Sequence, residues 1–162
     1  MQSAMTVSVS PAPPEALTDV DLDPIRGGFR AIVGYKLVAW DPGSAVVILD
    51  IRDEHLNRSG VVHGGVIATL LDAAGGYSGL HCSVTGNIRT CASISFSELF
   101  IAPGRPPRIE VRARQVSATR KTFFTEASAH NADGALIGTA QAAYRWADGS
   151  ERPEGVRREV GA

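Results

Sequence analysis

The residues best suited to chemistry lie in the segment 55–76. Asn57 and His63 precede the glycine pair Gly64–Gly65, and Asp72 follows on the helix that this pair introduces. A helix N-terminus presents unpaired N–H groups and the positive end of a dipole, which suit an oxyanion or a polarised carbonyl. A carboxylate can activate water or attack a carbonyl directly. The segment therefore contains the parts needed for acyl transfer.

The helix that carries Asp72 is predicted over about 65–81, and two of its faces differ. One face is apolar: Val66, Leu70, Ala73, Tyr77 and Leu80. The other places Asp72 among small residues: Ala68, Gly75, Gly76 and Gly79. Each glycine inside a helix costs roughly 0.5–1 kcal/mol relative to alanine. We therefore expect another helix, a backbone or a flat ligand to approach this face. Alternatively, Asp72 caps a loop or pairs with an arginine.

The elements around this helix predict an α+β domain. A short helix is expected over 23–33, and β-rich runs cover 35–40, 44–52, 91–101, 108–116, 122–129 and 135–145. Turn residues separate these runs, and Asp133–Gly134 is a hairpin signal. The late strands are therefore expected to be antiparallel, with the long helix on one face of the sheet. One helix cannot cover both faces, so we expect a partner subunit.

Composition narrows the class of protein. The 162 residues carry 16 Lys+Arg and 17 Asp+Glu, which argues against a nucleic-acid partner. The sequence shows neither an apolar run that could span a membrane nor a secretory signal, and a cytoplasmic location is expected. The spacings of His, Cys and Gly fit neither a zinc site nor the motifs of serine hydrolases, P-loop proteins or dinucleotide binders. We expect no metal and no cofactor.

Three parts of the chain are distinguished by composition. Residues 1–22 are rich in Pro and Ser and predict a flexible arm. Residues 23–147 form one domain. Residues 148–162 are charged and poor in apolar side chains, which predicts a frayed tail.

The central motif resembles a known family. It reads Asn57-x-x-Gly60-x-x-His63-Gly64-Gly65, followed by Leu70-Leu71-Asp72-Ala73-Ala74-Gly75. The likeness continues through the segment 90–97, the exit 100–103 and the segment 133–140, and it covers about residues 25–146. These patterns are similar to the hotdog-fold acyl-CoA thioesterases of the phenylacetic-acid-degradation, or PaaI-like, group. The resemblance implies a long central helix wrapped by a five- to six-stranded antiparallel sheet.

The resemblance also implies roles for residues and an assembly. Asp72 would be the general base or the nucleophile, and the Gly64 amide would polarise the thioester carbonyl. Asn57 would orient that carbonyl or the attacking water, and His63 would support the loop. A hydroxyl on the strand after the helix would assist water, and counting along the chain leaves Ser93 and Thr90 as alternatives. The active unit would be a homodimer, with a homotetramer expected as a dimer of dimers.

The substrate implied is an acyl-CoA, with coenzyme A as part of the substrate. Its phosphates call for donors at the rim of the site, for which the candidates are Gly65, Arg58, Arg89, Arg120 and Lys121. Solvated surface charge is the alternative for each basic residue. Two other functions compete with hydrolysis: a hydratase or dehydratase of acyl thioesters on the same fold, and a non-catalytic acyl-thioester binding module. The acyl group itself stays open.

Overall fold

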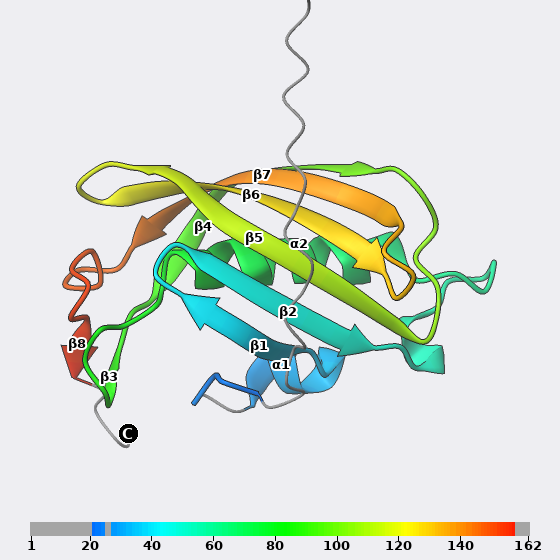
Figure 1. Ribbon diagram of the computed structural model, residues 1–162, viewed down its shortest axis with the longest axis horizontal. Helices are drawn as coiled ribbons and strands as arrows, with labels where there is room; N and C mark the ends of the chain where they lie inside the picture. The colour runs from blue at the N-terminus through cyan, green and yellow to red at the C-terminus, as the bar shows by residue number, and fades with distance from the viewer. Residues whose placement is uncertain (1–20, 25–26, 158–162) are drawn as a thin grey trace, which may run out of the picture.

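The computed structural model describes residues 21–24 and 27–157. In chain order its elements are α1 (Gly28–Val33), β1 (Lys36–Asp41), β2 (Ser44–Asp50), η1 (Asp53–His55), α2 (Gly64–Ser78), β3 (Asn87–Ile88), β4 (Cys91–Phe100), β5 (Arg108–Ala118), β6 (Thr122–Asn131), β7 (Leu136–Trp146) and β8 (Val156–Arg157). Six strands form one antiparallel sheet in the order β1-β2-β5-β6-β7-β4 (Figure 1). The predicted α+β class and the six main strands are confirmed.

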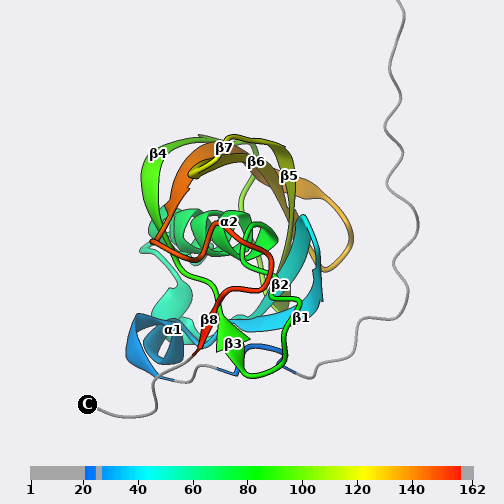
Figure 2. The same ribbon diagram turned by 90° about the vertical axis from the view of Figure 1, so that its left-hand side faces the viewer.

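The sheet curves around α2, so that the helix lies inside the curve and the opposite face of the sheet points away from it (Figure 2). Strands β4 and β1 are the two edges of the sheet. Glycines at the turns make the sharp reversals possible. Gly43 between β1 and β2 and Gly134 between β6 and β7 have φ values of 86° and 85°, in the region that favours glycine. The hairpin predicted at Asp133–Gly134 is confirmed.

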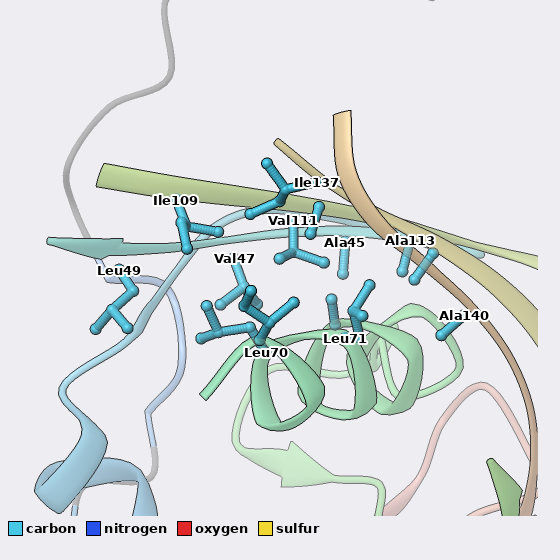
Figure 3. Close-up of a cluster of buried hydrophobic side chains, with 14 of the residues drawn as sticks. Ala45, Val47, Leu49, Leu70, Leu71, Ile109, Val111, Ala113, Ile137 and Ala140 are labelled. Atoms are coloured by element: carbon cyan, nitrogen blue, oxygen red, sulfur yellow. The ribbon is translucent and has the colours of Figure 1, made fainter. Parts of the chain in front are cut away.

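Aliphatic side chains fill the space between α2 and strands β2 and β5 (Figure 3). Leu70 and Leu71 of the helix are fully buried there, together with Val47 of β2 and Ile109 and Val111 of β5. The alternation of buried side chains along β5 places one in two residues against the helix. Burial of a leucine or isoleucine side chain contributes about 1.5–3 kcal/mol, so this cluster fixes the position of α2 against the sheet.

The face of α2 that packs inward differs from the predicted apolar face. The buried residues are Ile67, Leu70, Leu71, Ala74, Gly75, Gly76 and Ser78. Val66, Ala73 and Tyr77, expected on the apolar face, are only partly buried. The reason is that the curved sheet covers two sides of the helix, so residues of the small face are buried as well.

Aromatic side chains of the sheet occupy the space left by the helix glycines. Phe123 stacks on Tyr144 with ring centroids 5.0 Å apart, and the ring centroids of Phe123 and Trp146 are 4.7 Å apart. A Cβ on Gly79 would lie 2.2 Å from the Phe123 ring. The close approach expected at the small face is therefore made, at Gly75 and Gly79, by side chains of the same chain. At these positions the expectation of another helix, a backbone or a flat ligand was wrong.

The segments flanking the sheet are partly ordered against it. Leu22 donates its N–H to the Leu37 carbonyl, and Arg30 of α1 forms ion pairs with Asp21 and Asp23. The predicted arm of 1–22 thus ends in two residues that contact the domain, and residues 1–20 lie outside the described residues. The short helix expected over 23–33 is α1, which is confined to its second half.

The segment after β7 is not frayed as far as Arg157. Strand β8 pairs with β3, and Ser150 is fully buried. The Ser150 hydroxyl accepts a hydrogen bond from the Thr90 N–H, at 3.0 Å. The frayed tail predicted from the charged composition is therefore wrong for residues 148–157, because backbone pairing holds this segment. Residues 158–162 lie outside the described residues.

Candidate active site

Asp72 lies in the third turn of α2 with its side chain directed toward β4. The Ser93 hydroxyl donates to Asp72 Oδ1 at 2.8 Å, and Ser93 stands directly opposite Tyr144 of β7. Asp72 is partly buried. Within the described part of the chain, the salt bridges do not include Asp72. The alternative in which Asp72 pairs with an arginine is therefore not observed.

A bulge in β4 sets the direction of Ser93. The register of β4 against β7 shifts between Ser93 and Ser95. Ser93 contacts α2, and Phe96, three residues later, packs against the core on the same side. In a regular strand these two side chains would face opposite sides, and the inserted residue reconciles them. The bulge thus allows a polar contact with Asp72 and an apolar contact with the core from one strand.

Thr90, the other candidate hydroxyl residue, immediately precedes β4. Its N–H donates to Ser150 Oγ and its carbonyl accepts the N–H of Ala147 at 2.9 Å. These contacts tie Thr90 to the segment after β7. The structure brings Ser93, and not Thr90, into hydrogen-bond contact with Asp72.

Two further side chains border Asp72 that the sequence did not indicate as site residues. The Tyr144 hydroxyl donates to the main-chain carbonyl of Asp72 at 2.9 Å. Cys91 lies close enough for the Asp72 charge to act on it. Burial first, and then the Asp72 charge, raises the pKa of the Cys91 thiol to about 12, so this thiol is protonated at neutral pH. Burial and then Asp72 also raise the pKa of Tyr144.

The start of α2 is held by His63. Its ring Nδ1 accepts the Gly65 N–H at 2.9 Å, so His63 is the N-cap residue. The main-chain N–H of His63 donates to the His55 carbonyl at 2.8 Å, which anchors the loop that precedes the helix. The Gly65 amide N–H is therefore already hydrogen-bonded to the His63 ring. The Gly64 amide, at the first position of the helix, has no acceptor within the helix.

Asn57 shapes the loop before the helix. Its Oδ1 accepts the N–H of Ser59 at 2.8 Å and that of Val61 at 3.4 Å. Its main-chain N–H and carbonyl bond to Val61 and Gly60, which closes the turn from both sides. The neighbouring Arg58 is exposed at the tip of this turn.

Of the basic residues expected at the rim, Arg89 and Lys121 already have polar partners within the chain, whereas Arg120 is exposed. Arg89 donates from Nε to the Ser150 carbonyl at 2.8 Å and from Nη1 to the His81 carbonyl at 2.9 Å, and its guanidinium lies over the Trp146 ring. It therefore holds the segment after β7 in place. Lys121 pairs with Asp148 at 2.5 Å, whereas Arg120 is exposed in the turn between β5 and β6.

Among residues 21–24 and 27–157, no cluster of three or more His, Cys, Asp or Glu side chains could hold a metal ion. None of the described helices is long and apolar enough to cross a bilayer.

Comparison with known proteins gives one family and many similar structures. The model of the thioesterase superfamily matches residues 59–137. A comparison with curated proteins finds no significant match. Among solved structures, an Asn-to-Asp variant of the phenylacetic acid degradation protein PaaI from Thermus thermophilus is 26% identical, with a TM-score of 0.62 over 72% of this chain and 96% of that chain.

Two more distant structures share the fold. PaaI from E. coli is 20% identical, with a TM-score of 0.63 over 72% of this chain and 81% of that chain. A thioesterase from Haemophilus influenzae is 17% identical, with a TM-score of 0.65 over 73% of this chain and 81% of that chain. These similarities support thioester hydrolysis as the general type of reaction. The match to the thioesterase superfamily and the shared fold together support a hotdog-fold, PaaI-like thioesterase.

Proposed function

We propose that this protein hydrolyses acyl-CoA thioesters to a free acid and CoA, with Asp72 as general base or nucleophile. The observation that carries the proposal is the contact of Asp72 with Ser93. This contact holds the carboxylate of Asp72 in place on the central helix, and none of the described salt bridges includes Asp72. The fold that contains this helix is shared with thioesterases.

The two roles of Asp72 differ in the bond that forms first. As a base, the carboxylate takes a proton from water, whose oxygen bonds to the acyl carbon, and CoA leaves as the thiol. As a nucleophile, the carboxylate forms an acyl anhydride and releases CoA, and water then cleaves the anhydride. In both cases the Gly64 amide would stabilise the negative charge on the carbonyl oxygen, and Ser93 would orient the carboxylate or the water. Asn57 would orient that carbonyl or the water, and His63 would support the loop that positions the amide.

Distance along the helix argues for two copies of the chain at each site. Gly64 and Asp72 are eight residues apart on α2, which corresponds to about 12 Å. Both cannot contact one thioester group from the same chain. We therefore propose a homodimer in which Gly64 of one copy faces Asp72 of the other. The edge strand β4 is a suitable contact, because it exposes Ile94, Leu99 and Phe100.

A second contact between dimers would give the homotetramer. The face of the sheet opposite α2 carries oppositely charged pairs, Arg112 with Glu110 and Arg114 with Glu126. Both signs on one face suit a symmetric contact with a second copy. We include the homotetramer in the proposal on this ground.

The CoA phosphates would be bound by basic side chains at the rim. Arg58 and Arg120 are the preferred candidates, because both are exposed at turns. Lys121 would have to exchange Asp148 for a phosphate. Arg89 would have to bind with a guanidinium that already donates to two carbonyls, and Gly65 with an amide that already donates to His63.

The test is thiol release from a panel of aryl, short-chain and medium-chain acyl-CoA thioesters. We expect release from at least one class, together with one equivalent of free acid. A binding module would bind a non-hydrolysable CoA thioether without releasing thiol from any thioester. A hydratase would add or remove 18 mass units from an enoyl- or hydroxyacyl-CoA while the thioester stays intact. Either of these results would replace the proposed function.

A further inference from the structure

Tyr144 is a fully buried side chain whose hydroxyl ends at the main chain of Asp72. Its Oη donates to the Asp72 carbonyl at 2.9 Å, and the side chain is 1% exposed. This bond crosses from β7 to α2 and is formed to the residue that also accepts from Ser93. Asp72 is thus held at two points, at its carboxylate and at its backbone.

Gly75 permits this approach. A Cβ at position 75 would lie 2.4 Å from Tyr144 Oη and 3.0 Å from Thr125 Oγ1. Atoms at 2.4 Å would overlap, so any residue with a side chain would displace Tyr144 or the helix. A glycine in mid-helix disfavours the helix. The close contact with Tyr144 gives a physical reason for its presence.

Tyr144 is paired with a residue on each neighbouring strand, Phe123 of β6 and Ser93 of β4. It stacks on Phe123 at an interplanar angle of 17°, and it stands opposite Ser93 across the β4–β7 pair. The two hydroxyls that reach Asp72 therefore come from directly paired residues of neighbouring strands. A shift of α2 along the sheet would break both hydrogen bonds together.

We infer that Tyr144 is a positioning residue for hydrolysis, which sets the place of Asp72 relative to Ser93 through its hydrogen bond to the Asp72 carbonyl, and that Gly75 makes room for it. The inference rests on the proposed function, in which Asp72 acts on the thioester. Tyr144 acts through Asp72 and needs no contact with the substrate.

The test compares Tyr144→Phe in two backgrounds, wild type and Asp72→Asn. In the wild type we expect kcat to fall about 10-fold with KM changed less than about twofold, because the reacting group is misplaced while binding persists. In Asp72→Asn the added substitution is expected to leave the residual rate unchanged. The matched control is Tyr77→Phe, which removes a tyrosine hydroxyl that donates to Asp23 and is expected to keep kcat.

An unchanged kcat in Tyr144→Phe would overturn the inference and leave the proposed function standing. An equal loss in both backgrounds would also overturn it, because a general structural role predicts that result. If Asp72→Asn alone keeps the wild-type rate, the proposed function fails and the inference fails with it.

A second pair of variants tests the fit of Gly75. Gly75→Ala is expected to lower the melting temperature, because of the overlap with Tyr144 Oη. Removing that oxygen in Gly75→Ala/Tyr144→Phe is expected to recover part of the melting temperature without recovering kcat. A double variant less stable than Gly75→Ala would contradict the proposed contact.

Discussion

Ser93 Oγ lies 2.8 Å from Asp72 Oδ1, which joins the central helix to an edge strand through one polar contact. This contact is made by Ser93 and not by Thr90, the other hydroxyl residue near the start of β4. It also determines how the carboxylate is oriented, because the hydroxyl donates to one oxygen and leaves the other available. An acceptor held in this way is suited to receive a proton from water.

Substitution of Ser93 tests that contact. Ser93→Ala is expected to lower kcat about 10-fold or more, since the carboxylate loses its donor. Ser93→Thr, which keeps the hydroxyl, is expected to retain most of the rate. Thr90→Ala is the control and is expected to retain wild-type kcat, because the Thr90 contacts are made by its backbone. A loss of rate in Thr90→Ala with none in Ser93→Ala would reverse the assignment.

Complementation tests the shared site. Gly64→Pro removes the amide donor at the first helical position, where proline is well tolerated, and His63 has the extended conformation that precedes proline readily (φ −61°, ψ 134°). We expect Gly64→Pro and Asp72→Asn to be nearly inactive alone. Co-expressed, they should form heterodimers with one intact site, about a quarter of all sites for random pairing of a symmetric dimer.

The measurement is the rate of thiol release per subunit in the co-expressed mixture, compared with each variant purified alone. Activity that stays at the level of the single variants, in a mixture shown to contain heterodimers, would place both residues of a site in one chain. The proposed arrangement would then be wrong.

Gly76 in α2 and Gly79 at the C-cap of this helix are expected to respond to alanine substitution with opposite changes in stability. A Cβ at Gly76 would meet its nearest neighbours at 3.8 Å, so Gly76→Ala should stabilise the protein by roughly 0.5–1 kcal/mol. A Cβ at Gly79 would overlap the Phe123 ring, so Gly79→Ala should destabilise it by about 1–3 kcal/mol. Denaturant unfolding measures both. Equal effects would show that the packing of Phe123 on Gly79 is not as described.

Cys91 offers a readout of the charge on Asp72. Burial and the Asp72 carboxylate raise the pKa of Cys91 from 9.0 to about 12, and only the thiolate is alkylated. In a Cys82→Ser background, alkylation at pH 8 should therefore be at least about tenfold slower than in the unfolded chain, even after the higher nucleophilicity of a high-pKa thiolate is allowed for. The rate should rise with pH up to about 12.

Asp72→Asn removes the negative charge and should lower the pKa of Cys91, which speeds alkylation at a fixed pH. An unchanged alkylation rate in this variant would mean that the carboxylate does not act on Cys91. Circular dichroism of the variant excludes a rate increase caused by unfolding.

Much of the fold could be predicted from local pattern. The β-rich runs 91–101, 108–116 and 135–145 located three strands to within about two residues of their observed ends, because turn residues separate them. The turn at Gly134 was recognisable because its φ of 85° favours glycine. Strand β8 could not be predicted in this way, because its pairing with β3 depends on residues about 70 positions apart.

Part of the site was also predictable from local pattern in the sequence. Asp72 and the glycine pair stand out as an unusual pattern on one helix. The choice of Ser93 depends on a bulge in β4, and the role of Tyr144 on a contact between residues 72 positions apart. Neither follows from periodicity. The signal for Tyr144 was Gly75 itself, since a costly glycine in mid-helix indicates that a bulky neighbour approaches.

The most direct test of the account is the kcat/KM for CoA release by wild type and by Asp72→Asn, with affinity for a non-hydrolysable CoA thioether measured in both. Asparagine keeps the size of the side chain and removes its basicity. The account predicts a kcat/KM lowered by about 10²-fold or more with the thioether affinity unchanged. Equal kcat/KM values in a folded variant would contradict it, because Asp72 would then have no part in the chemistry.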